Sequence, residues 1–345
     1  MKSLIRIGFI LVLVVGGYFG FKTYQRVYAP MVNLEEEELA IFIQSDWSQA
    51  DVVAYLDSLD IIRRPRDLSW VMDKKNYRDN LVIPGKYTLR NKMSGADLVD
   101  HLRAGRGEEE VRVTFNSTRT LEELAGSVGQ FIEADSAAIL NKLKEGQVAA
   151  DLGFSQNTFK TMFLPDTYFM EWDSDPEEFI SRMAIEYKNF WTGKRKARAR
   201  ELGLSQSEVT TLASIVQAEQ QSFPDERRRI AGLYLNRLNR GMRLQSDPTV
   251  VFALGDFNKQ RVLRADLSVE SPYNTYKYAG LPPGPINIPS KQSIDAVLNA
   301  EDHNYIYMCA KADFSGYHAF ATNLSKHNAN ARAFQRALNE RKIYR

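Results

Sequence analysis

The acidic residue Glu219 combines a position and a residue type that suit acid catalysis. It follows Val216 by three residues and Leu212 by seven, so a helix here places it beside the apolar face, near the C-terminus. Removal from water and the negative end of the helix dipole both favour the protonated form, so we expect a raised pKa. A carboxylic acid that stays protonated near neutral pH can cleave an ether-like bond as a general acid. The alternative is that the helix ends near residue 219 and the carboxylate faces water.

Two predicted helices hold Glu219 in a corner. The first begins with a capping-box pattern at residues 205–208, and the second starts with the Ser-Phe-Pro-Asp-Glu segment at 222–226 and ends near Gly241. A carboxyl group between two such helices is partly shielded from water.

Polar and aromatic residues are interleaved in three segments downstream, at 242–250, 271–276 and 280–286. Amides can bind the hydroxyl and acetamido groups of a sugar polymer, and tyrosine faces can pack on pyranose rings. The prolines of the third segment stiffen a loop because they fix φ. Structural turns use similar residues, so these segments alone leave both interpretations open.

Several motifs in this order resemble the endolytic murein transglycosylases of the YceG-like family. The resemblance covers roughly residues 37–340 and is carried by the segments 84–87, 164–168, 212–219 (LASIVQAE), 233–238, 243–249 (RLQSDPT), 273–276, 280–285, 316–320 and 323–328. Two departures are Gln217, where the family often has an acid, and Ser290, where glycine is usual.

The resemblance implies a fold, an activity and a location. Residues 37–110 would form a small LysM-like α/β module and residues 111–345 a mixed α+β lytic domain, in a single-pass inner-membrane protein with a periplasmic body. Glu219 aligns with the family's catalytic glutamate. Peptidoglycan strands are the implied substrate, cut within the chain, and peptidoglycan synthases (penicillin-binding proteins) are implied partners, with the cut terminating nascent strands.

The mechanism expected from this resemblance needs one acid. Glu219 protonates the oxygen between N-acetylmuramic acid and N-acetylglucosamine, and its carboxylate then takes the proton of the muramic C6 hydroxyl, which closes a 1,6-anhydro ring. The candidates for orienting the glycan are Tyr234, Asn236, Arg237, Gln245, Asp247, Tyr273, Asn274, Tyr276 and His318. Alternatively, Asp247 caps a turn, Tyr234 belongs to the core, and His318 orients Glu219.

Composition limits the remaining possibilities. The 345 residues suffice for about two domains, and 44% hydrophobic with 26% charged residues is ordinary for a globular protein. A net charge of +2 gives no electrostatic case for nucleic acid. The single cysteine, Cys309, excludes an internal disulfide, and no metal-ligand or nucleotide motif is present, so we expect neither a metal nor a cofactor.

An uncharged apolar run at residues 7–21 predicts a membrane anchor. Counted from Ser3, a helix to Phe21 is about 28 Å long, close to the ~30 Å hydrocarbon core of a bilayer. A cleaved signal peptide and a buried core helix are the alternatives. We expect an α+β protein with a stub and transmembrane helix at 1–22, a linker at 23–36, and the two domains given above.

Local patterns predict the elements of these domains. We expect strands at 39–44, 86–89 and 111–115, and helices at 48–59, 67–75 and 94–105, from 120 and from 175. A turn is predicted at 164–168.

Two other functions remain open. The chain could be a non-catalytic glycan-binding scaffold for cell-wall synthases, with a structural Glu219. It could also be a muramidase that uses water and releases reducing ends.

Overall fold

The computed structural model of the chain describes residues 2–105, 110–259 and 261–341. In these ranges the fold is α+β, with helices and three two-stranded sheets. The chain divides into two compact units. Unit 1 comprises residues 1–113, 129–134 and 168–175, and unit 2 comprises residues 114–128, 135–167 and 176–345. The sequence places the border between module and lytic domain at 110/111, beside residues 106–109, which lie outside the described residues, and this border stays a prediction.

Unit 1 begins with the long helix α1 (Lys2–Tyr28), of which Arg6–Tyr28 is long and apolar enough to cross a membrane. Residues 23–36, expected to be a linker, are instead part of the unit. They remain helical to Tyr28, and then Met31 and Val32 are fully buried in the core. The backbone N–H groups of Met31 and Val32 donate to the carbonyl of Met93. This apolar segment is therefore packed in the core and is not a solvated linker.

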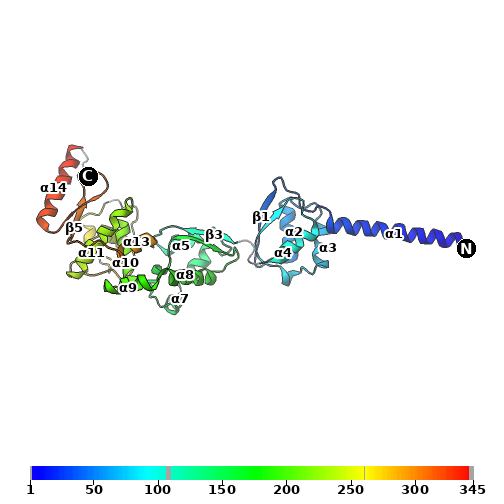
Figure 1. Ribbon diagram of the computed structural model, residues 1–345, viewed down its shortest axis with the longest axis horizontal. Coiled ribbons are helices and arrows are strands. Elements are labelled where there is room, and N and C mark those ends of the chain that lie inside the picture. The colour runs from blue at the N-terminus through cyan, green and yellow to red at the C-terminus, as the bar shows by residue number, and fades with distance from the viewer. Residues whose placement is uncertain (1, 106–109, 260, 342–345) are drawn as a thin grey trace. The chain divides into compact units, whose positions relative to one another are not determined.

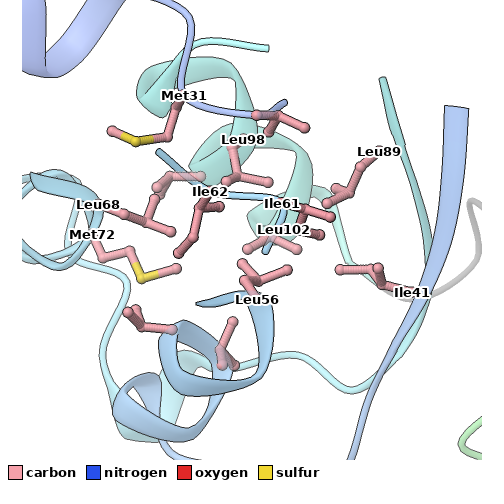
Figure 2. Packing of buried hydrophobic residues seen from close by; sticks show 14 of the residues in the cluster. Met31, Ile41, Leu56, Ile61, Ile62, Leu68, Met72, Leu89, Leu98 and Leu102 are labelled. Atoms are coloured by element: carbon pink, nitrogen blue, oxygen red, sulfur yellow. The ribbon is translucent and has the colours of Figure 1, made fainter. Parts of the chain in front are cut away.

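The rest of unit 1 packs three helices beside a two-stranded antiparallel sheet. Strand β1 (Glu38–Ile43) pairs antiparallel with β2 (Gly85–Arg90), beside α2 (Gln49–Ser58), α3 (Pro65–Lys74) and α4 (Gly95–Ala104). Figure 2 shows their apolar side chains converging, among them Ile41, Leu56 and Leu98. The capping boxes predicted for α2 and α4 are confirmed. The LysM-like character of this module stays a prediction.

Strands β3 (Val111–Phe115) and β4 (Asp166–Met170) form the second sheet. The turn predicted at 164–168 is therefore wrong over most of its length. Thr167, Tyr168 and Phe169 are β-branched or aromatic residues, which favour strands, and the Thr167 hydroxyl lies 2.8 Å from that of Thr114.

The part of unit 2 that contains the end of α10 is a helical core with a small sheet (Figure 1). Helices α10 (Gln206–Glu219), α11 (Arg227–Asn239) and α13 (Lys291–Leu298) contact one another and bury an apolar cluster. The antiparallel pair β5 (Tyr307–Ala310) and β6 (His318–Ala321) contacts α14 (Leu324–Glu340). The remaining helices are α5 (Leu121–Val128), α6 (Ser136–Lys144), α7 (Gly146–Asp151), α8 (Pro176–Phe190), α9 (Gly193–Glu201) and α12 (Asp247–Leu254).

Candidate active site

Glu219 is the last residue of α10. The helix starts at the predicted capping box of Ser205 and Glu208, and its residues from Val209 to Val216 are buried, which fixes its orientation in the core. The chain reverses through a 3-10 turn at Pro224–Glu226, and α11 then begins at Arg227. Helix α11 thus starts a few residues later than the sequence suggests. Its Tyr234 nevertheless lies next to Glu219 at the end of α10.

Two hydroxyl groups donate hydrogen bonds to the same oxygen of Glu219. Tyr234 on α11 donates to Oε1 over 2.8 Å, and Ser246 also donates to Oε1. Within the described part of the chain, no side chain or backbone group bonds to Oε2. Since Oε1 is used as an acceptor, the proton of the neutral carboxyl group belongs on Oε2.

The surroundings of Glu219 favour its protonated form. Glu219 is partly buried, and the removal of its carboxyl group from water raises its pKa. The hydrogen bonds from Ser246 and Tyr234 and the charge of His318 act in the opposite direction, whereas the negative charge of Asp247 adds to the rise. The net direction is upward, as expected from the sequence.

Glu219 opens on a cavity of about 460 Å³. The cavity is formed by α10, α11, the start of α12, the β5–β6 sheet and the start of α14. Its lining includes six of the nine side chains proposed from the sequence to orient a glycan: Tyr234, Arg237, Gln245, Asp247, Tyr276 and His318. Residues as far apart in the sequence as 219 and 318 therefore meet at one surface.

The loop that presents Ser246 is held from two sides. The Arg237 guanidinium donates to the side-chain carbonyl of Gln245 over 2.6 Å and to the backbone carbonyl of Leu244 over 3.0 Å. The backbone N–H of Ser246 donates to the hydroxyl of Thr275 over 3.0 Å. Gln245 has a φ of 53°, which is uncommon for a residue with a side chain and needs such support. Arg237 therefore positions the loop and, through it, the hydroxyl on Glu219.

Asp247 begins α12 and has a partner in the cavity. The hydroxyl of Tyr276 donates to its Oδ1 over 2.5 Å. Asp247 and Tyr276 therefore place an acid and an aromatic ring in the cavity that Glu219 also lines.

His318 is paired with the buried acid Glu226. Its Nδ1 lies 2.7 Å from Glu226 Oε2, which also accepts a bond from Gln220 over 2.8 Å. Burial opposes ionisation, but the hydrogen bonds from His318 and Gln220 outweigh it and lower the pKa of Glu226. This pair fixes the imidazole beside Glu219. The sequence gives no local signal for it, because the two residues are 92 positions apart.

Three of the proposed side chains do not line the cavity. Asn236 donates to the carbonyls of His303 and Tyr305, and Asn274 is fully buried and donates to carbonyls of its own loop. The ring of Tyr273 packs on Phe252 with centroids 4.7 Å apart. None of the three therefore faces the cavity that Glu219 lines.

Several lining residues were not proposed from the sequence as site residues. They include Tyr307 and Cys309 on β5 and His327 and Asn328 on α14. Ser246, which donates to Glu219 from behind the cavity surface, was not proposed either. Ser246 and Asn328 lie in motifs used for the resemblance, which is the signal that could have found them. Tyr307 stacks on His327 with ring centroids 5.2 Å apart, so aromatic faces are present in the cavity. Among the described residues, no group of three or more His, Cys, Asp or Glu side chains is arranged to hold a metal ion.

Two further cavities adjoin the one that Glu219 lines. A second cavity of about 410 Å³ shares Asp247 with the first, and a third of about 370 Å³ shares Arg119, Ala218 and Asn287 with the second. All three belong to unit 2. A chain-like ligand could therefore extend away from the acid along the surface.

Comparison with known proteins identifies relatives along most of the chain. The model of the YceG-like family matches residues 41–333. A Bacillus subtilis (strain 168) protein named endolytic murein transglycosylase is 28% identical, over 95% of this chain and 93% of its own. A Streptococcus pneumoniae (serotype 2, strain D39) protein of the same name is also 28% identical over 93% of this chain, which spans 63% of that relative. A crystal structure of a Listeria monocytogenes protein described as YceG-like has a TM-score of 0.56 and 26% identity, covering 85% of this chain and 98% of that one.

Proposed function

Because the chain belongs to the YceG-like family, we propose that it is a peptidoglycan lytic transglycosylase with Glu219 as its catalytic residue. The shared name of its relatives, endolytic murein transglycosylase, supports an enzyme that acts on peptidoglycan. The observation that carries the assignment of Glu219 is its carboxyl group, which lines a polar and aromatic cavity, accepts two hydrogen bonds on Oε1 and has a raised pKa.

The proposed reaction moves one proton out and one back. Oε2 of Glu219 donates its proton to the oxygen between N-acetylmuramic acid and N-acetylglucosamine while the bond from that oxygen to the muramic C1 breaks. The substrate's 2-acetamido group stabilises the oxocarbenium-like centre. The Glu219 carboxylate then takes the proton of the muramic C6 hydroxyl, whose oxygen bonds to C1. The product is a 1,6-anhydro end, no water is consumed, and the acid is regenerated.

We propose different tasks for the neighbouring residues. Gln245, Asp247, Tyr276 and His318, which line the cavity, are the residues proposed to contact the sugars, whereas Arg237 holds the loop of Ser246. Tyr234 supports Oε1 with its hydroxyl and is otherwise core, since only 1% of its surface is exposed. The continuation of the hollow past Glu219 supports cutting within a strand rather than only at its end.

One observation favours a second candidate, a muramidase. Asp247 is a second carboxylate in the cavity of Glu219, and paired carboxylates are used by hydrolases that activate water. In that reaction water attacks C1 and leaves a reducing end. The two reactions therefore differ in their products.

The proposed location is the inner membrane, with α1 as a single span and the rest of unit 1, together with unit 2, in the periplasm. An uncleaved helix is supported by the path of α1, which continues without a break into the packed part of unit 1. The division into an anchor, a LysM-like module at 37–110 and a lytic domain at 111–345 belongs to this proposal. So do the peptidoglycan synthases as partners and the termination of nascent strands.

The test is digestion of purified sacculi by the full chain and by Glu219→Gln. The variant keeps the acceptor on Oε1 and removes the transferable proton. The matched control is Glu208→Gln, on the same helix, because glutamine also serves in a capping box. We expect the parent and the control to release fragments with anhydro ends and Glu219→Gln to release none. Reducing ends in the mass spectra would assign the muramidase reaction. Equal digestion by Glu219→Gln would refute the catalytic role of Glu219, and no digestion by the parent would leave the scaffold function.

A further inference from the structure

We propose that unit 1 binds anionic phospholipid headgroups through a basic face formed by Arg26 of α1 and Arg66, Trp70 and Lys74 of α3. We call these four residues the headgroup face. The proposal rests on α1 spanning the membrane and is independent of the reaction proposed for Glu219.

The C-terminal end of α1 packs directly against the rest of unit 1. The Arg64 guanidinium donates to the carbonyl of Gln25 over 3.1 Å, and Val27 packs against the core. The N-terminal turn of α4 approaches so closely that a Cβ on Gly95 would lie 3.1 Å from the carbonyl oxygen of Arg26. The position of α1 in a bilayer therefore determines the height of α3 above it.

That height corresponds to the headgroup layer. Lys22 is the first charged residue after the apolar run, and Arg26 lies one helical turn, about 6 Å, further along the axis. A bilayer has roughly 5–7 Å of polar headgroup region on each side of its hydrocarbon core. Arg26 and the residues of α3 that touch it consequently lie among the headgroups.

The side chains of the headgroup face suit that layer. Trp70 lies between two cations, with its ring 5.5 Å from the Arg26 guanidinium and 5.7 Å from the Lys74 ammonium. Arg66, Trp70 and Lys74 are spaced by four residues and share one face of α3, whereas Leu68 and Val71 point into the core. Tryptophan is enriched at membrane interfaces, and basic residues next to a span attract anionic lipids.

The charge of this surface is not balanced by its own carboxylates. Asp67 lies 3.0 Å from Arg26 and 3.7 Å from Arg64, so one acid serves two arginines. In the described ranges, Arg66 and Lys74 have no carboxylate within salt-bridge distance. Anionic lipid is the partner favoured over a soluble polyanion, because the anchor holds the face at the bilayer.

The test uses the full chain in lipid nanodiscs that carry a lipid with a nitroxide on its headgroup, which quenches nearby tryptophan fluorescence. Discs of phosphatidylcholine are compared with discs that also contain phosphatidylglycerol. Trp191 is buried, whereas Trp47 and Trp172 are partly exposed, so the quenching that is lost in Trp70→Phe measures the contribution of Trp70. The double variant Arg66→Gln/Lys74→Gln removes two charges, and Arg103→Gln, near the opposite end of α4 from Gly95, is the matched control.

We expect stronger quenching in the anionic discs, with more than half of it lost in Trp70→Phe. The double variant should lower quenching in anionic discs to the level in phosphatidylcholine, because each charge near an anionic surface changes partitioning about fivefold. High salt should do the same, and Arg103→Gln should match the parent.

Equal quenching in both lipids, or quenching that does not depend on Trp70, would overturn the proposal. Binding of the detergent-solubilised chain to DNA that the double variant loses would assign the face to another polyanion. Digestion of sacculi by all of these variants in detergent should be unchanged, which separates this test from that of the reaction.

Discussion

Replacing Ser246 by alanine removes one of the two hydrogen bonds accepted by Glu219 Oε1 and leaves the bond from Tyr234. Ser246 is fully buried, so water does not readily take the place of its hydroxyl. Its hydrogen bond lowers the pKa of Glu219, against the larger effect of burial. Without it, the pKa of Glu219 should rise further.

The size of the effect follows from the difference between two kinds of hydrogen bond. A bond to a charged group contributes about 1.5–3 kcal/mol and a bond between neutral groups about 0.5–1.5 kcal/mol. Ser246→Ala therefore destabilises the ionised carboxylate by about 1 kcal/mol more than the neutral acid. That corresponds to a roughly fivefold rise in the ratio of protonated to ionised Glu219 at a given pH.

The assay is the initial rate of release of soluble fragments from sacculi as a function of pH. A general acid must be protonated, so the rate falls at high pH as Glu219 ionises, and in Ser246→Ala this fall should occur at higher pH. Ser214→Ala is the matched control, since it removes a buried hydroxyl of α10 that bonds to Thr211 and Ile286 instead. We expect it to lower stability without moving the alkaline fall. An unchanged fall in Ser246→Ala, or one at lower pH, would refute the reasoning.

Three further predictions concern the same unit. Asp247→Asn removes a negative charge that raises the pKa of Glu219, so the alkaline fall of the rate should move to lower pH, opposite to Ser246→Ala; a shift in the same direction contradicts this. Glu219→Gln should stabilise the fold, because an acid with a raised folded-state pKa costs stability once pH exceeds its unfolded value near 4.5. The gain in unfolding free energy should grow from there to neutral pH in denaturant titrations, and a gain that is constant with pH would argue against burial. Gly284→Ala should lower the melting temperature by overpacking worth about 1–3 kcal/mol, since its Cβ would lie 1.9 Å from the carbonyl oxygen of Asn157, whereas Gly193→Ala, with open space around it, should not. Equal melting temperatures for the two glycine variants would contradict this prediction, because they would show that the loop of Asn157 can move aside at no cost in stability.

Sequence signals that involve only neighbouring residues predicted the helix starts correctly. Each capping box, at Ser48, Ser94 and Ser205, marks a helix start in the structure, because its hydrogen bonds involve residues three apart. The raised pKa of Glu219 was also predictable, since the apolar residues of α10 indicate which way the helix faces.

The features that the sequence did not reveal depend on contacts between distant segments. Residues 29–36 resemble a tether until the backbone groups of Met93 and Ile61 pair with them. The strand at Asp166–Met170 needs β3 as its partner. The Ser246 hydroxyl reaches Glu219 only because Thr275 and Arg237 hold its loop, and Glu226 reaches His318 across 92 positions. Asn236 and Asn274 show the converse, because their residue types suit sugar binding but their amides are used by backbone carbonyls.

The protonation of Glu219 can be followed in the full chain labelled with 13C at the glutamate side-chain carboxyl carbons. The signal of Glu219 is identified by its loss in Glu219→Gln, and its chemical shift is recorded against pH in nanodiscs. We predict a titration midpoint above the ordinary value of 4.5. A midpoint at or below 4.5 would contradict the role of Glu219 as the proton donor.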